Sequence, residues 1–272
     1  MIIPYDEFIE DLNKKIKMGQ EFYNELLITV INNPNRYVGI FRLSNAKTKL
    51  IQNVTQSREI KFGDFMEDII TKYIEKMGYH NINKSIGTDE NGDALSADQV
   101  FIKDNTVYLI EQKIRDDHDS TKKRGQYQNF RKKYILLKDK FPDKEINASM
   151  WFIDDSLVKN KNYYLSEARN ESIDRVKLNV FYGSSIFKEL FHDTLVWDEL
   201  IEYLSINKMD RTTETLLIPD FDTSPEMLEA LKHLKRTKLK LYNKLISDNP
   251  TYVQLRKELF PTNYNIDIVK KL

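Results

Sequence analysis

Hydrophobic residues recur every three or four positions along the first third of the chain, which is the spacing of an amphipathic helix. Within residues 5–31 this spacing predicts two helices that are separated near Gly19. A second stripe, over residues 62–77, predicts a strong amphipathic helix that ends at Gly78. Glu67 then lies partway along this helix.

The period changes to that of β-strands after residue 98. Residues 100–102 and 106–110 are rich in β-branched and aromatic side chains, and the turn-forming sequence between them predicts a β-hairpin. The second of these strands is apolar on both faces, so we expect it to be central in a sheet covered on both sides. The segments that follow are expected to be a helix at 120–140, strands at 149–153 and 177–182, and helices at 184–206, 225–246 and 250–259.

This alternation predicts an α/β fold with a central mixed β-sheet and flanking helices. We divide the chain into an N-terminal helical region at 1–57, an α/β core at 58–206 and a C-terminal helical region at 207–272, packed as one compact unit. With only 8 Gly and 7 Pro in 272 residues there is little material for linkers, so almost the whole chain should be ordered.

The amino-acid composition limits the kinds of functional site that this chain can form. The chain has no cysteine, which excludes a disulfide framework, a thiolate zinc site and a cysteine nucleophile. Its 42 basic and 42 acidic residues balance, so binding to a polyanion would have to come from local patches rather than from bulk charge. The start of the chain has no secretory signal pattern and no later stretch reaches the roughly 18 apolar residues of a membrane span, so we expect a cytoplasmic protein.

Three charged residues stand out because they accompany the apolar hairpin. Glu111 and Lys113 close the second strand and alternate onto the same face, while Asp98 precedes the first strand, where hairpin pairing can bring it beside them. Two carboxylates this close raise each other's pKa unless a cation lies between them, and oxygen ligands favour a hard ion such as Mg²⁺. Glu67 is the candidate third acid, although it could also belong to the solvated face of its helix.

A magnesium site with an adjacent lysine suits phosphodiester hydrolysis. The metal would polarise the scissile phosphate and activate a water, and Lys113 would orient that water or offset charge in the transition state. The plainer alternative makes Asp98 an ordinary acid at the start of a strand, and Glu111 with Lys113 an exposed ion pair.

Asp98, the Glu111-Gln112-Lys113 unit and Glu67 on a preceding helix together resemble the PD-(D/E)xK nuclease superfamily, and within it the type II restriction endonucleases. The resemblance covers roughly residues 60–155 and implies a restriction-endonuclease-like core with Asp98, Glu111 and Lys113 as catalytic residues. It also implies that Asp98 and Glu111 bind Mg²⁺, with Glu67 expected from its place on the preceding helix to complete the metal site. The chain departs from the family pattern at Ala97, where a proline often stands, and Gln112 occupies the variable position on the opposite face.

The resemblance further implies partners. The expected substrate is double-stranded DNA cut at a short specific sequence, and the expected assembly is a homodimer, because two sites related by a twofold axis cut both strands of a symmetric sequence. A cognate DNA methyltransferase of the same restriction-modification system is expected, without a stable complex.

A basic segment follows the catalytic motif and is the candidate DNA contact. Residues 113–133 carry eight basic side chains against three acids. The DNA-binding candidates are Arg115, Lys122, Lys123, Arg124 and Gln126, whereas residues 131–133 fit a solvated helix face equally well. We interpret the acidic run at 116–119 as a polar loop rather than a metal cluster. A second basic run, at 232–244, is either a DNA contact or a dimer helix.

Two other functions stay open at this point. One is a structure-directed repair nuclease or junction resolvase on the same core, and the other is a DNA-binding protein without catalytic activity.

Overall fold

The computed structural model describes residues 1–114, 120–210 and 218–272. The chain forms two compact units, each of which combines segments from distant parts of the sequence. One comprises residues 1–9 and 63–210 and is called the α/β unit; the other comprises residues 10–62 and 211–272 and is called the helical unit.

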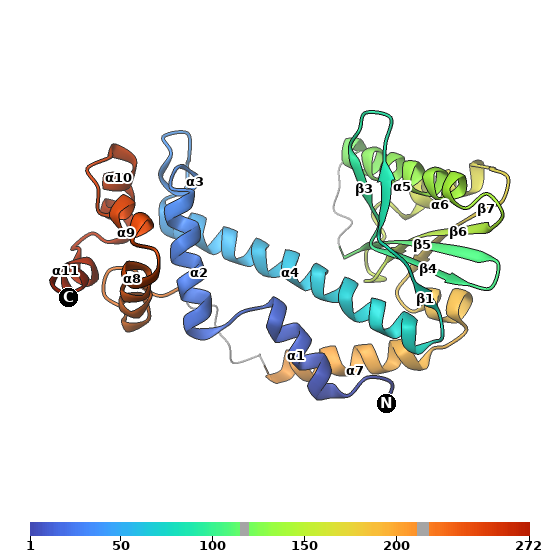
Figure 1. Ribbon diagram of the computed structural model, residues 1–272, viewed down its shortest axis with the longest axis horizontal. Coiled ribbons are helices and arrows are strands. Elements are labelled where there is room, and N and C mark those ends of the chain that lie inside the picture. Colours follow the sequence, from blue (N-terminus) through green and yellow to red (C-terminus); the bar gives the residue numbers. More distant parts are fainter. Residues whose placement is uncertain (115–119, 211–217) are drawn as a thin grey trace. The chain divides into compact units, whose positions relative to one another are not determined.

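The α/β unit is built on a five-stranded sheet with the order β1-β4-β5-β6-β7 (Figure 1). Strands β1 (His80–Asn81), β4 (Gln99–Lys103) and β5 (Thr106–Lys113) pair antiparallel, whereas β5, β6 (Glu145–Phe152) and β7 (Val176–Tyr182) pair parallel. The sheet is therefore mixed and β5 is central, as the apolar pattern predicts. A small hairpin of β2 (Ser85–Thr88) and β3 (Ala94–Ser96), which the pattern does not predict, precedes β4.

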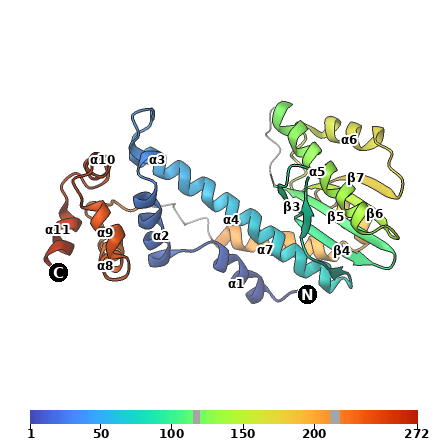
Figure 2. The same ribbon diagram turned by 45° about the horizontal axis from the view of Figure 1, so that its top comes forward.

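Helices cover both faces of this sheet (Figure 2). The first face packs on α5 (Ser120–Lys140) and α6 (Lys161–Asn170), and its core includes Val107, Leu109 and Tyr134. On the second face, Trp151 contacts Phe187 and the ring of Trp197 on α7 (Leu195–Asp210). The predicted α/β fold with a central mixed sheet and flanking helices is confirmed.

The helix expected at 184–206 is interrupted. A π-helical turn over Phe187–Phe191 comes first, and His192 then adopts a left-handed conformation with φ of 56°. The backbone N–H of Asp193 donates to the carbonyl of Phe187, and the Asp193 carboxylate accepts from the N–H of Leu195, where α7 begins. Local hydrogen bonding by Asp193 therefore stops one helix and starts the next, which a hydrophobic pattern does not reveal.

The helical unit combines helices from the N-terminal part of the chain with helices from its C-terminal part. Helices α1 (Tyr5–Lys15) and α2 (Gly19–Asn32) confirm the two expected at the N-terminus, with α1 crossing from one unit to the other; the short α3 (Asn35–Val38) follows. Near the C-terminus lie α8 (Pro225–Thr237), α9 (Leu239–Leu245), α10 (Pro250–Leu259) and α11 (Tyr264–Lys271). The expected helix at 225–246 is therefore divided at Lys238, and α11 was not expected.

The helix that carries Glu67 is longer than the pattern predicts. It is α4 (Ala46–Lys76), which begins 16 residues before the expected start and contributes its first part to the helical unit and its last part to the α/β unit. Leu50 and Val54 are buried in the first part, but the polar residues around them hide this stripe in the sequence. No helix in the described ranges is long and apolar enough to cross a membrane.

Candidate active site

The strand register brings the predicted catalytic residues together. In the β4–β5 hairpin Gln99 pairs with Ile110 and Val100 with Leu109, so the same register places Asp98, just before β4, opposite Glu111. Directly opposed residues project from the same face, and Lys113 joins that face because side chains alternate along β5. The backbone N–H of Gln112 donates to Asp98 Oδ2 at 2.7 Å, which fixes this carboxylate at the end of the strand.

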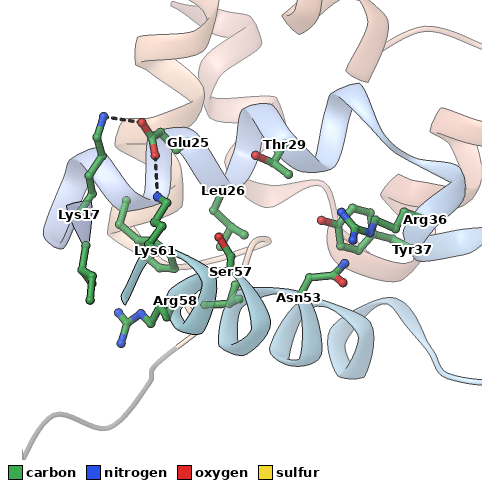
Figure 3. Close-up of a pocket in the computed structure, with 13 residues that line it drawn as sticks. Lys17, Glu25, Leu26, Thr29, Arg36, Tyr37, Asn53, Ser57, Arg58 and Lys61 are labelled. Carbon is green, nitrogen blue, oxygen red and sulfur yellow. Dashed lines mark hydrogen bonds and ion pairs between the residues drawn. The ribbon is translucent and has the colours of Figure 1, made fainter. Parts of the chain in front are cut away.

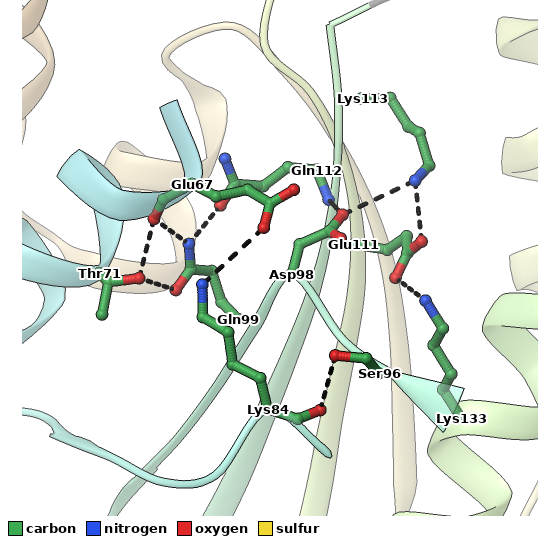
Figure 4. A network of polar contacts seen from close by, with 10 residues as sticks. All are labelled: Glu67, Thr71, Lys84, Ser96, Asp98, Gln99, Glu111, Gln112, Lys113 and Lys133. Carbon is green, nitrogen blue, oxygen red and sulfur yellow. Dashed lines mark hydrogen bonds and ion pairs between the residues drawn. The ribbon is translucent and has the colours of Figure 1, made fainter. Parts of the chain in front are cut away.

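One ammonium group links the two carboxylates (Figure 4). Lys113 Nζ lies 2.8 Å from Glu111 Oε1 and 3.7 Å from Asp98 Oδ2. Glu111 is only 6% exposed, so these residues are not the exposed surface ion pair of the plainer alternative. A positive charge therefore already lies between the buried carboxylate of Glu111 and the partly buried carboxylate of Asp98.

A second lysine, which the sequence reasoning missed, binds the same carboxylate from another element. Lys133 on α5 is 4% exposed, and its Nζ lies 2.6 Å from Glu111 Oε2. Of the two alternatives left open for residues 131–133, the solvated helix face does not hold for Lys133. A signal was present: Lys133 stands three residues after Phe130 and four before Leu137, and both of these side chains are buried, so the lysine belongs to the inward stripe of its helix.

Burial and charge act in opposite directions on these groups. Burial tends to raise the pKa of Glu111, but Lys113 and Lys133 outweigh it, and the pKa lies below the usual value. Burial and the neighbouring Glu111 raise the pKa of Asp98, because the lysines offset them only in part. Burial tends to lower the pKa of Lys113, yet the two carboxylates raise it above its ordinary range. Of the two carboxylates, Glu111 is therefore the one whose ionised form is favoured.

Glu67 approaches the same site from α4, and a buried amide network holds its backbone. Gln99 Nε2 donates to the carbonyl of Glu67 at 2.7 Å and to Gln112 Oε1 at 2.6 Å. Thr71 Oγ1 also donates to the Glu67 carbonyl, at 2.8 Å, and to Gln99 Oε1, at 2.7 Å. This network lies on the face of the hairpin opposite to the carboxylates, as expected for Gln112, and fastens α4 to the sheet.

The Glu67 side chain is half-buried and faces other acids. Burial, the nearby Asp98 and other carboxylates raise its pKa to about 7, although Lys84 Nζ, 3.9 Å from Glu67 Oε2, partly opposes the shift. Among the described residues no three Asp, Glu, His or Cys side chains are close enough to form a complete metal-binding group. Carboxylate oxygens are the ligands that a hard divalent ion prefers, and the two at this site already share one cation, the ammonium of Lys113.

Those predicted DNA-binding residues that the structure describes make no recorded contact with the carboxylates. Lys123 on α5 lies over the ring of Tyr163, and Gln126 accepts a hydrogen bond from the hydroxyl of Tyr164, so both are engaged by α6. Lys122 and Arg124 are exposed near the start of α5. Arg115 and the acidic run at 116–119 lie outside the described residues.

Comparison with known proteins gives one match to a family. A family model described as "Type II restriction endonuclease, HinfI" matches two overlapping stretches, residues 4–99 and 81–207, which together span most of the chain. No curated protein and no solved structure matches. The matched residues include every member of the carboxylate and lysine cluster described above.

Proposed function

Since the chain belongs to the HinfI family of type II restriction endonucleases, we propose that it hydrolyses DNA through the cluster of Asp98, Glu111 and Lys113, with Mg²⁺ as cofactor. The observation that carries this proposal is the shared ammonium: two carboxylates from neighbouring strands meet on one cation at the end of a central strand. Its substrate is double-stranded DNA, and the finer proposal is that cleavage occurs at one short sequence.

Asp98 and Glu111 are the proposed metal ligands, with Glu67 as the third acid. A divalent ion bound there supplies a polarised phosphate and a water of lowered pKa. The contribution of the chain is to position these oxygens at one end of the β4–β5 pair, because the N–H of Gln112 holds Asp98 and the buried amide network holds the backbone of Glu67 on α4.

The two lysines have different proposed roles. Lys113 lies between the carboxylates and is the group that orients the attacking water and offsets negative charge developing on the phosphate. Lys133 contacts the other oxygen of Glu111, Oε2, and is proposed as a positioning residue that fixes the orientation of this carboxylate. The Glu111 carboxylate accepts hydrogen bonds from two different elements, from Lys113 on β5 and from Lys133 on α5. It therefore has little freedom to rotate.

The wider assignment follows the family. We propose that the enzyme acts as a homodimer in the cytoplasm and that a methyltransferase of the same system protects the host DNA without forming a stable complex. The exposed basic residues Lys122 and Arg124 are proposed to contact backbone phosphates, together with Lys123 and with Arg115. Gln126 is the proposed base reader or companion of the active site.

Plasmid digestion tests the proposal. Purified enzyme with Mg²⁺ should produce discrete, reproducible fragments, and sequencing of their ends gives the recognition site. Glu111→Ala and Lys113→Ala should each abolish cleavage and leave duplex binding largely intact, with Glu111→Ala also losing metal affinity. Glu145→Ala is the matched control, because Glu145 is exposed and lies at the opposite end of the β5–β6 pair.

Three results would contradict the proposal. Undiminished cutting by both active-site variants would place catalysis elsewhere. Selective cutting of branched DNA with intact linear plasmid would favour a structure-directed nuclease. Duplex binding by the parent without cleavage at any divalent-metal concentration would favour a protein that only binds DNA.

A further inference from the structure

The helical unit contains a cavity of about 150 Å³ between α2, the first part of α4 and the segment that joins α1 to α2 (Figure 3). Part of its wall is apolar, formed by Phe22, Leu26 and Val54. A cavity of this order, about 150 Å³, holds a molecule of the size of benzene, so it has room for one six-membered ring. None of its lining residues belongs to the catalytic cluster.

The cavity is strongly cationic. Four basic side chains line it, against the single carboxylate of Glu25, and these four are Lys17, Arg36, Arg58 and Lys61. Glu25 already binds two of them, with Lys17 Nζ at 2.5 Å and Lys61 Nζ at 3.6 Å (Figure 3), and Lys17 Nζ also lies 2.5 Å from Glu21 Oε1. Over the described ranges of the chain, Arg36 and Arg58 have no carboxylate partner. Two guanidinium groups, of the exposed Arg36 and the partly buried Arg58, therefore have no paired acid at the cavity, which favours an anionic occupant.

Two hydrogen-bond donors at the cavity are poorly satisfied. Arg58 Nε is buried without a hydrogen-bond partner among the described residues, and Asn53 Nδ2 is buried with only a weak contact to the hydroxyl of Tyr37. A buried donor without an acceptor costs about 1–3 kcal/mol, so an occupant that supplies acceptors gains this amount for each. Along α4 the polar lining residues Asn53, Ser57 and Lys61 follow at intervals of four, which places them on one face of the helix.

A flat ring has suitable surfaces here. The guanidinium of Arg58 lies over the ring of Phe22, with its carbon 5.4 Å from the ring centroid, and planar groups of both kinds stack on nucleobases. An apolar ligand would leave the two donors and the two arginines unsatisfied, and a simple inorganic anion would leave the apolar wall uncovered. The occupant that matches all three features has a small ring, acceptor atoms on that ring and a negative charge.

We propose that this cavity binds one nucleotide unit, with the base against the apolar wall and the buried donors and its phosphate at the cationic rim. The proposal uses the function proposed above only for one source of the ligand. A nucleotide extruded from bound DNA and a free mononucleotide share this chemistry, and extrusion from a duplex costs a few kcal/mol that pocket contacts must offset.

The test uses the full-length enzyme in EDTA with two substitutions at the cavity. Arg58→Met removes a charge and a donor at similar length, and Asn53→Leu removes the other donor. Lys49→Met is the matched control, because it removes a positive charge from the same helix at a partly buried position outside the cavity. Thermal melting of each variant establishes that it is folded before binding is compared, and two independent cavity variants keep the test decisive if one fails to fold.

Two binding measurements separate the sources. Isothermal titration with each of the four deoxynucleoside monophosphates tests the free ligand, and 2-aminopurine placed at each position of the mapped cleavage site reports extrusion through a rise in fluorescence. Binding of a free monophosphate, weakened at least tenfold in both cavity variants and unchanged in Lys49→Met, supports a free nucleotide. A fluorescence rise that is lost in both cavity variants and kept in the control supports a nucleotide of DNA.

The proposal is overturned if neither signal is seen, if the cavity variants behave as the control does, or if inorganic phosphate competes as well as the nucleotide, since the base is then not recognised. Plasmid cleavage by the same parent preparation is measured alongside. Normal cleavage without nucleotide binding refutes this inference alone, whereas absence of cleavage bears on the proposed function.

Discussion

Glu67→Gln tests whether Glu67, the proposed third acid, interacts electrostatically with the carboxylates of the catalytic cluster. Burial and the neighbouring Asp98 raise the pKa of Glu67 from 4.5 to about 7, so its proton is retained in the folded protein at pH values where the unfolded chain has lost it. A raised folded pKa contributes stability that is fully present below the unfolded pKa and is lost as the pH rises through the folded pKa. The metal-free parent should therefore lose stability between pH 4.5 and 7, whereas the glutamine variant lacks this loss.

The size of the expected stability change follows from the pKa shift of Glu67 and from the exposed fraction of its side chain. A shift of about 2.5 pKa units corresponds to at most about 3.4 kcal/mol. The Glu67 side chain is 37% exposed, and solvent screens such interactions strongly, so the expected effect is about 1 kcal/mol. For a unit of this size, about 1 kcal/mol corresponds to a melting temperature about 2–4 °C higher for the variant at pH 8.

The assay is thermal melting in EDTA across pH 4.5 to 8.5, followed by the same series with Mg²⁺. Glu75→Gln is the matched control, since it makes the same change at an exposed position of α4. The difference in melting temperature between the parent and Glu67→Gln should increase as the pH rises from 4.5 to 7. At pH 8, Mg²⁺ should stabilise the parent more than the variant. Parallel melting profiles of parent, variant and control would refute the reasoning, because Glu67 would then be an ordinary surface acid.

Three further changes test the contacts around the site. Lys133→Met should lower the cleavage rate about 10²-fold, because Glu111 is then misplaced, and it should change the affinity for Mn²⁺ that is measured by titration. Lys133→Arg should restore part of the activity. Equal cleavage rates in the parent and the Met variant would contradict a positioning role for Lys133. Thr71→Val should lower the free energy of unfolding, measured by urea denaturation, by about 1–3 kcal/mol, because it leaves Gln99 Oε1 without its donor. The same change at the exposed Thr55 should not have this effect. An equal loss of unfolding free energy in the two variants would contradict the prediction. Arg124→Ala should reduce the slope of log affinity against log salt by about 1 for duplex DNA; an unchanged slope would remove Arg124 from the phosphate contacts.

Local patterning was sufficient for the core elements and for the central cluster. The β-branched and aromatic residues of β4 and β5 predict the hairpin, and the alternation of side chains predicts that Glu111 and Lys113 share a face. Hairpin register is a short-range property, so the position of Asp98 opposite Glu111 follows from residues within 14 positions of each other. The family resemblance rested on the same residues, and the match over residues 4–207 agrees with it.

Contacts between distant segments were decided only by the tertiary structure. Lys133 binds Glu111 because a parallel crossover returns α5 over the face of the sheet that carries the carboxylate, and no local pattern specifies which buried partner a helix residue meets. Gln99, Gln112 and Thr71 likewise become one network only when α4 packs on the hairpin. Secondary structure depends on neighbouring residues, whereas pairing of buried polar groups depends on the three-dimensional positions of all candidates at once, because each such group must find a partner on folding.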